Sequence, residues 1–224
     1  MGQMQLSEFQ SELLFEMGND DTINEYRTDW INRAYRTLTT QDQFFGKDIS
    51  LYFPELETST ASTTADGTAT VAMPSDAHFI RTIWESSSDV KMTNISWSDY
   101  IERTGRGTED SRSAPRFWVR RGTNVYMYPT PDGAYGITMY YKKQITELSD
   151  ATDTIEIGEE WDEAVLKLCV IQSMYRMKRY GDAEKEETIF LNMVSGIASA
   201  YAHESEDRED RRFPDSTWVE NEYR

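Results

Sequence analysis

The sequence predicts an α+β fold in which a four-helix bundle carries a central antiparallel β insertion and ends in an extended arm. Apolar residues recur at helical spacing toward both ends of the 224-residue chain, whereas the middle alternates and is interrupted by turn residues. The last segment combines many charges with few apolar side chains. The predicted parts are an N-terminal helical pair at 1–47, a β-rich insertion with an Arg-rich loop at 48–150, a C-terminal helical pair at 151–202 that completes the bundle, and a charged docking arm at 203–224.

Two apolar stripes predict the first helical pair. The segment 5–18 places Leu6, Phe9 and Leu13 on one face, and Ser7 with Gln10 has the spacing of a capping box. A second stripe runs through Trp30 to Leu38. The link between the two segments is short, which predicts that the helices are antiparallel neighbours.

The middle of the chain changes to the two-residue period of strands. Residues 57–72 are Thr-rich around Asp66-Gly67, and they are compatible with a Ser/Thr linker or with a hairpin. We favour the hairpin, because Thr recurs at strand spacing and Asp-Gly suits a tight turn. A half-buried strand is expected at 78–85, short helical turns at 97–104 and a loop at 105–115.

Three further strands are expected where alternating segments are separated by turn residues. They cover residues 117–121, 125–128 and 137–142, and Gly122 and the run 129–133 supply the turns. This arrangement predicts an antiparallel meander.

The second helical pair follows an acidic run. Four carboxylates at 159–163 suit the first turns of a helix, where the helix dipole favours negative charge. Residues 164–177 are apolar around most of the circumference, which predicts the most buried helix of the fold. Gly181 is expected to end that helix, and a last apolar stripe extends to Tyr201.

Composition excludes several classes of protein. The chain has 40 Asp and Glu against 23 Lys and Arg, a net charge of −17 that disfavours a general nucleic-acid binder. One cysteine, Cys169, and two histidines offer no multi-cysteine or His-rich metal site. No segment is apolar enough for a membrane span, and no nucleotide-binding or hydrolase motif is present. These observations predict a soluble, intracellular, non-enzymatic protein that has no cofactor and no metal.

Residues 103–121 are locally basic, with six arginines against two acidic residues. Arginine interleaved with aromatic residues suits either nucleic-acid phosphate and bases or an acidic protein partner. We favour the protein partner, because the whole chain is acidic and a second copy would supply acidic surface. The candidate interface residues are Arg103, Arg106, Arg112, Arg116, Trp118 and Arg120.

The last segment has two interpretations, a solubilising end or an arm that binds a partner. We favour the arm, because large aromatic anchors are typical of interfaces. The proposed docking residues are Phe213, Trp218 and Tyr223. If the chain forms a closed ring, its acidic surplus is repeated around a central channel, where it would let DNA slide. The candidate residues for the wall of this channel are Glu204, Glu206, Asp207, Glu209 and Asp210. Alternatively, these acidic groups simply face solvent and keep the monomer soluble.

The order of several segments resembles the head–tail connector, or adaptor, proteins of tailed bacteriophages. Residues 30–36 (WINRAYR) are similar to that family's second-helix segment, and residues 71–81 (VAMPSDAHFIR) are similar to an element that follows its hairpin. Residues 115–131 and 140–149 resemble its Pro-flanked strands and its YYK stretch, with Gln144 where Pro is common. The Arg-rich loop and the Trp-containing end depart from the pattern.

The resemblance implies a non-enzymatic virion protein at the head–tail junction, assembled in the host cytoplasm. It implies a dodecameric ring that lies under the portal protein and contacts tail or neck proteins. Double-stranded DNA would pass through this ring, and no membrane would be involved. The C-terminal segment would reach the portal. Alternatives are another neck or tail-terminator ring protein, or a DNA-packaging component, which would need a basic recognition helix. A hydrolase would need two carboxylates in a cleft, and the sequence identifies no such pair.

Overall fold

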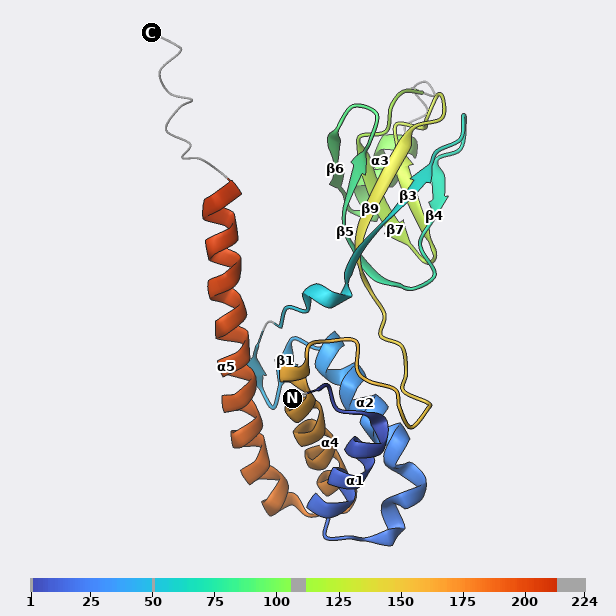
Figure 1. Ribbon diagram of the computed structural model, residues 1–224. Helices are drawn as coiled ribbons and strands as arrows, with labels where there is room; N and C mark the ends of the chain where they lie inside the picture. Colours follow the sequence, from blue (N-terminus) through green and yellow to red (C-terminus); the bar gives the residue numbers. More distant parts are fainter. Residues whose placement is uncertain (1, 50, 106–111, 213–224) are drawn as a thin grey trace. The chain divides into compact units, whose positions relative to one another are not determined.

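The computed structural model describes residues 2–49, 51–105 and 112–212, and it describes only the backbone at residues 21, 22 and 202–212. The chain forms two units, and each has a core of its own (Figure 1). Unit 1 comprises Met1–Pro54 and Ile145–Arg224 and is mainly helical. Unit 2 comprises Glu55–Gln144 and is mainly β.

Unit 1 is built around helix α4 (Asp162–Arg176). Helices α1 (Leu6–Glu16), α2 (Arg27–Thr40) and α5 (Tyr180–Arg212) all pack against it. Val165, Leu168 and Cys169 are among the many buried residues of α4. A helix that is surrounded in this way needs apolar side chains around most of its circumference, which accounts for its sequence.

Short elements complete unit 1. The 3-10 helices η1 (Asp21–Tyr26) and η3 (Glu159–Trp161) lead into α2 and α4, and η2 (Pro54–Leu56) lies at the unit boundary. Strands β1 (Gln43–Phe44) and β2 (Lys47–Asp48) form a small hairpin. Its aromatic residues hold it on α5, because the rings of Phe44 and Phe45 lie 5.5 and 5.9 Å from that of Phe190.

The start of the chain is bound to the segment that precedes α4. The Gln3 side chain donates a 2.6 Å hydrogen bond to the carbonyl of Ile157, and the backbone N–H of Leu6 donates to Asp153 at 2.8 Å. The capping box at the start of α1 pairs Gln5 with Glu8. The predicted box at Ser7 and Gln10 was therefore wrong by two residues, since Ser7 already lies inside the helix.

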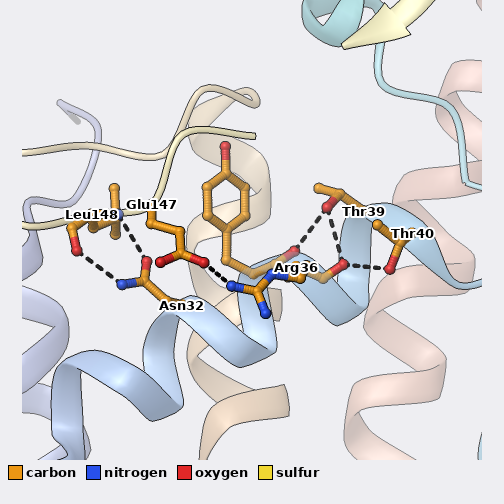
Figure 2. Close-up of polar contacts among 7 residues, drawn as sticks. Asn32, Arg36, Thr39, Thr40, Glu147 and Leu148 are labelled. Carbon is orange, nitrogen blue, oxygen red and sulfur yellow. Dashed lines mark hydrogen bonds and ion pairs between the residues drawn. The ribbon is translucent and has the colours of Figure 1, made fainter. Parts of the chain in front are cut away.

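The segment after unit 2 is anchored on α2. The Asn32 side chain accepts a hydrogen bond from the backbone N–H of Leu148 and donates one to its carbonyl, both at 2.8 Å (Figure 2). Tyr35 accepts a hydrogen bond from the N–H of Glu156 at 2.7 Å. Side chains of α2 thus bind backbone groups of the irregular segment that follows unit 2.

Unit 2 contains a seven-stranded sheet in the order β3-β9-β5-β6-β7-β8-β4. The strands are β3 (Glu57–Thr63), β4 (Thr70–Ala72), β5 (Ala77–Glu85), β6 (Val90–Asn94), β7 (Phe117–Arg121), β8 (Asn124–Tyr128) and β9 (Gly136–Lys143). Helix α3 (Trp97–Gly105) lies in the connection between β6 and β7, which pair in parallel, while the other neighbours are antiparallel.

The sheet curls so that strands β5 to β9 contribute side chains to one hydrophobic cluster (Figure 1). Ile83, Met92, Trp118, Val125 and Met139 are fully or almost fully buried in it. Because successive strand residues face opposite sides, the alternate residues of the same strands lie on the outer face.

The predicted fold class was wrong. The described residues contain five α-helices, and one of them, α3, belongs to unit 2 rather than to a bundle. The β region is not a small antiparallel insertion but a curled mixed sheet of seven strands with its own core. Helical periodicity locates helices, yet it does not state how many of them pack together, because that depends on contacts between distant segments.

Two predicted strand pairings were also wrong. Asp66-Gly67 does form a turn, with an isolated bridge between Ala65 and Thr68, but β3 and β4 continue to opposite edges of the sheet. β7 and β8 pair as expected, whereas β9 pairs with β3 and β5 instead of completing a meander. Turn residues fix where the chain reverses, and long-range packing chooses the partner strands.

The end of α4 differs from expectation as well. The helix ends at Arg176, and Lys178 adopts the left-handed conformation with a φ of 61°. Gly181, expected to end the helix, lies in the first turn of α5. Helix α5 extends to Arg212, so the backbone of the first part of the predicted arm is helical.

Candidate protein interface

The outer face of β7 and β8 carries an arginine–aromatic cluster, defined here as Trp97, Tyr100, Arg103, Phe117, Arg121, Tyr126 and Tyr128. Helix α3 supplies the first three residues and begins with a reciprocal cap. The Asp99 N–H donates to Ser96 Oγ at 3.1 Å, and the Ser96 N–H donates to the Asp99 carboxylate at 3.4 Å. This cap sets where the helix starts, and hence which of its side chains face the sheet.

Three aromatic rings fix α3 on the sheet. The ring centroids of Trp97 and Tyr100 are 5.2 Å apart and stacked, and both rings meet Tyr126 edge to face, at 5.2 and 5.7 Å. Burial, and then the neighbouring Tyr126, raise the pKa of Tyr100. The tyrosine therefore stays neutral and serves as packing in this cluster.

Two exposed arginines lie over aromatic rings of the arginine–aromatic cluster. The guanidinium carbon of Arg121 is 4.1 Å from the Trp97 ring centroid, and that of Arg103 is 4.4 Å from Phe117. A cation over an aromatic face at an exposed site contributes about 0.5 to 1 kcal/mol. The stacking also restricts each side chain, so that less conformational entropy is lost when its planar fork binds a carboxylate.

The other predicted interface arginines are held in different ways. Arg112 lies 3.7 Å from the Asp66 carboxylate, beside the turn at Gly67. Arg120 donates a 2.6 Å hydrogen bond to the carbonyl of His78 and so joins β7 to β5. The side chain of Arg116 is exposed. Arg106 lies outside the described residues.

Trp118 is placed in the core of unit 2, where it is only 2% exposed. Its alternate neighbour Phe117 faces outward into the arginine–aromatic cluster, as the strand period requires. The structure thus separates two aromatic residues that are adjacent in the sequence.

Four residues of this cluster were not among the predicted site residues, namely Trp97, Arg121, Tyr126 and Tyr128. The alternation of Tyr126 and Tyr128 in a predicted strand was the available signal, because it places both on one face. Their link to Trp97 depends on α3 lying across that face, which only the fold shows.

The charge of the chain is unevenly distributed between the two units. Unit 2 contains 10 Lys and Arg against 11 Asp and Glu, a net charge of −1. Unit 1 contains 13 against 29, a net charge of −16. Each copy therefore presents one nearly neutral unit with exposed arginines and one strongly acidic unit.

The residues predicted for the docking arm and the channel wall lie at the C-terminal end of the chain. Phe213, Trp218 and Tyr223 lie outside the described residues. The acidic residues Glu204, Glu206, Asp207, Glu209 and Asp210 belong to α5, but only their backbone is described.

Three observations on the described residues concern metal binding, the single cysteine and the membrane. Among them, no cluster of His, Cys, Asp and Glu could hold a metal ion. Cys169 is buried, and burial raises the pKa of its thiol to about 12. In the part of the chain that is described, no helix combines the length and the apolar character needed to cross a bilayer.

One family model matches the chain. It is described as SU10 adaptor protein, and the match covers residues 4–217, which includes both units. The comparison with curated proteins found no significant match.

Proposed function

Because the chain belongs to the SU10 adaptor protein family, a family of phage structural adaptors, we propose that it forms a ring under the portal that joins the phage head to the tail. In this proposal twelve copies surround the channel through which double-stranded DNA passes, and one end of the ring contacts tail or neck proteins. The observation that carries the proposal is the family match over nearly the whole chain.

The charge distribution supports contacts between copies. A ring needs a heterologous interface, in which one patch of each subunit meets a different patch of the next. Unit 1, at −16, and unit 2, at −1 with exposed arginines, supply two such unlike surfaces on every copy. Exposed arginines that meet acidic surface of the next copy would favour association and fix which patches meet.

The proposal is tested by the mass and shape of the purified protein, alone and mixed with portal protein. We expect rings of twelve copies, or monomers that form such rings on the portal, in native mass spectra and electron micrographs. A protein that stays monomeric with portal and instead completes isolated tails would be a tail terminator, and the proposed position would be wrong.

The channel wall is proposed to be acidic. DNA carries dense negative charge, so an acidic wall would not hold it during packaging and ejection. The acidic residues of α5 between Glu204 and Asp210 are the candidates. A ring whose lumen is lined mainly by Lys and Arg, or a ring that binds DNA at physiological salt, would contradict this assignment.

Truncation after Arg212 is expected to abolish stable attachment to the portal while leaving both units folded. The removed segment contains Phe213, Trp218 and Tyr223, the proposed anchors. Trp218→Ala alone should weaken attachment by about 2 kcal/mol if this residue is a hot spot. Co-sedimentation with portal measures the attachment, and circular dichroism checks the fold. Normal attachment of the truncated chain would show that residues 213–224 are not a docking arm.

The double variant Arg103→Ala, Arg116→Ala is expected to weaken assembly of the ring, because both side chains are exposed cations of unit 2. A matched control, Lys47→Ala with Lys185→Ala, removes two exposed cations from unit 1 and should assemble normally. Sedimentation velocity at two salt concentrations measures both variants. Unchanged assembly together with lost DNA retention in particles would assign these arginines to DNA instead.

A further inference from the structure

The first described residues of the chain form a strap, defined here as residues 2–5, on the segment of unit 1 that precedes α4. The Gln3 side chain reaches two backbone carbonyls of that segment. It donates a hydrogen bond to Ile155 and a second one, of 2.6 Å, to Ile157. These contacts fix the start of the chain against a segment that is far away in the sequence.

Hydrogen bonds rather than buried side chains hold the strap in place. Gln5 forms an antiparallel bridge with Thr154, and the Met4 N–H donates to the Asp162 carboxylate at 2.7 Å. No residue of the strap is buried, whereas Leu6, the first residue of α1, is only 1% exposed. Segments with few buried apolar contacts open at a lower free energy than the core. The strap can therefore open while the helices of unit 1 stay folded.

The carboxylate under the strap is almost completely buried. Asp162 is 8% exposed, and its Oδ2 accepts the hydrogen bond from Met4. Its other oxygen, Oδ1, has no hydrogen-bond partner among the described residues. The charged groups that act on it are Glu159 and Glu160 of η3 and Glu8 of α1. A buried carboxylate among other carboxylates is disfavoured in its charged form.

The acidity of Asp162 reflects these surroundings. Burial raises its pKa to about 6, the three acidic neighbours add to the rise, and the hydrogen bond from Met4 opposes it without cancelling it. From α5, the uncharged Tyr201 hydroxyl donates a hydrogen bond to Glu160. While the strap is closed, Asp162 therefore gains its charge near pH 6 instead of near pH 4.

We propose that the strap is a pH-sensitive latch, which is held most firmly while Asp162 is protonated and opens more readily, independently of the rest of unit 1, once Asp162 is charged. The geometry carries this inference, because a strap without buried side chains lies against a buried carboxylate whose second oxygen is unpaired. Opening returns the carboxylate to water, which supplies the missing hydrogen bonds.

The sign and size of the effect follow from the two pKa values of Asp162. The closed strap corresponds to a pKa of about 6, and a carboxylate in water to the ordinary value of 3.8. The closed form binds the proton more tightly, so closing is favoured most below about pH 4 and loses this contribution as the pH rises through 6. The equilibrium constant for opening should therefore increase about a hundredfold between pH 4 and pH 7 and then level off.

The first test is amide hydrogen exchange of the full chain, followed by NMR between pH 4 and pH 8. Protection factors correct for the intrinsic pH dependence of exchange. We expect the Met4 amide to be at least tenfold less protected than that of Leu168 in the core of α4, and its protection to fall about a hundredfold from pH 4 to pH 7. Equal protection of the two amides would show that the strap opens only when unit 1 unfolds. Protection of Met4 that is absent, or constant over this range, would also overturn the latch.

Two variants identify the titrating group in the same experiment. Asp162→Asn keeps an acceptor for the Met4 N–H but cannot gain a charge, so the protection of Met4 should stay constant from pH 4 to pH 7. Gln3→Ala, the control, removes contacts of the strap that do not titrate, and it should lower the protection roughly tenfold at every pH. A pH dependence like that of the wild type in Asp162→Asn, or one that is lost in Gln3→Ala, would show that Asp162 does not control the strap.

Discussion

Replacement of Asn32 by alanine is expected to lower the free energy of unfolding of unit 1 by about 3 kcal/mol. The Asn32 side chain satisfies both the N–H and the carbonyl of Leu148, each at 2.8 Å (Figure 2). Asn32 and Leu148 are both buried, so water cannot easily replace the lost partners. Each buried backbone group left unpaired costs roughly 1 to 3 kcal/mol. Urea unfolding followed by the helical signal at 222 nm measures the change.

Arg36→Ala is the matched control, because Arg36 lies one turn further along α2 and binds the adjacent residue of the same segment, Glu147 (Figure 2). Both side chains of this ion pair are more than half exposed, at 55% and 58%. Exposed ion pairs contribute about 0 to 1 kcal/mol, so the control should lose far less stability than Asn32→Ala. Equal losses in the two variants would show that the buried backbone contact has no special weight.

Asp162→Asn is expected to stabilise unit 1 at pH 7 by about 2 to 3 kcal/mol and to have almost no effect below pH 4. Burial raises the pKa of Asp162 to about 6, from an ordinary value of 3.8, and the hydrogen bond from the Met4 N–H opposes that rise. One pKa unit corresponds to about 1.4 kcal/mol. The amide oxygen of Asn can still accept the 2.7 Å hydrogen bond from Met4.

The direction of the pH dependence follows from the raised pKa. The folded protein holds the proton on Asp162 more tightly than the unfolded chain, so this residue favours folding most below about pH 4. That contribution is lost as the pH rises to about 6 and stays absent above it. The difference in stability between Asp162→Asn and wild type should therefore grow between pH 4 and 6 and then level off. A difference that is the same at pH 4 and pH 8 would contradict the assignment.

Asp162 also shows how tertiary structure changes the meaning of a local signal. The acidic run 159–163 predicts carboxylates that are favoured by the start of a helix. The helix does begin there, at Asp162, but the bound N-terminal segment covers this carboxylate and makes its charge unfavourable. The covering residue, Met4, is 158 positions away in the sequence, so no local pattern could reveal it.

The elements themselves were largely predictable from the sequence. Apolar spacing located α1, α2 and α4, alternation located β5, β7, β8 and β9, and turn residues located the reversal at Asp66-Gly67. These signals are local, because they arise from the periods of helix and strand and from backbone preferences at single residues. Strand β6 lacks a clear alternation and was not predicted.

The sequence by itself determined most of the helical and β segments, the acidic balance and the order of motifs that resembles adaptor proteins. Tertiary structure alone decided that β3 and β4 separate to opposite edges, that β9 lies between β3 and β5, and that Phe117 and Trp118 have opposite surroundings. The physical reason is that local periodicity fixes which side of an element is apolar, whereas the choice of partner depends on burial summed over segments far apart in the chain.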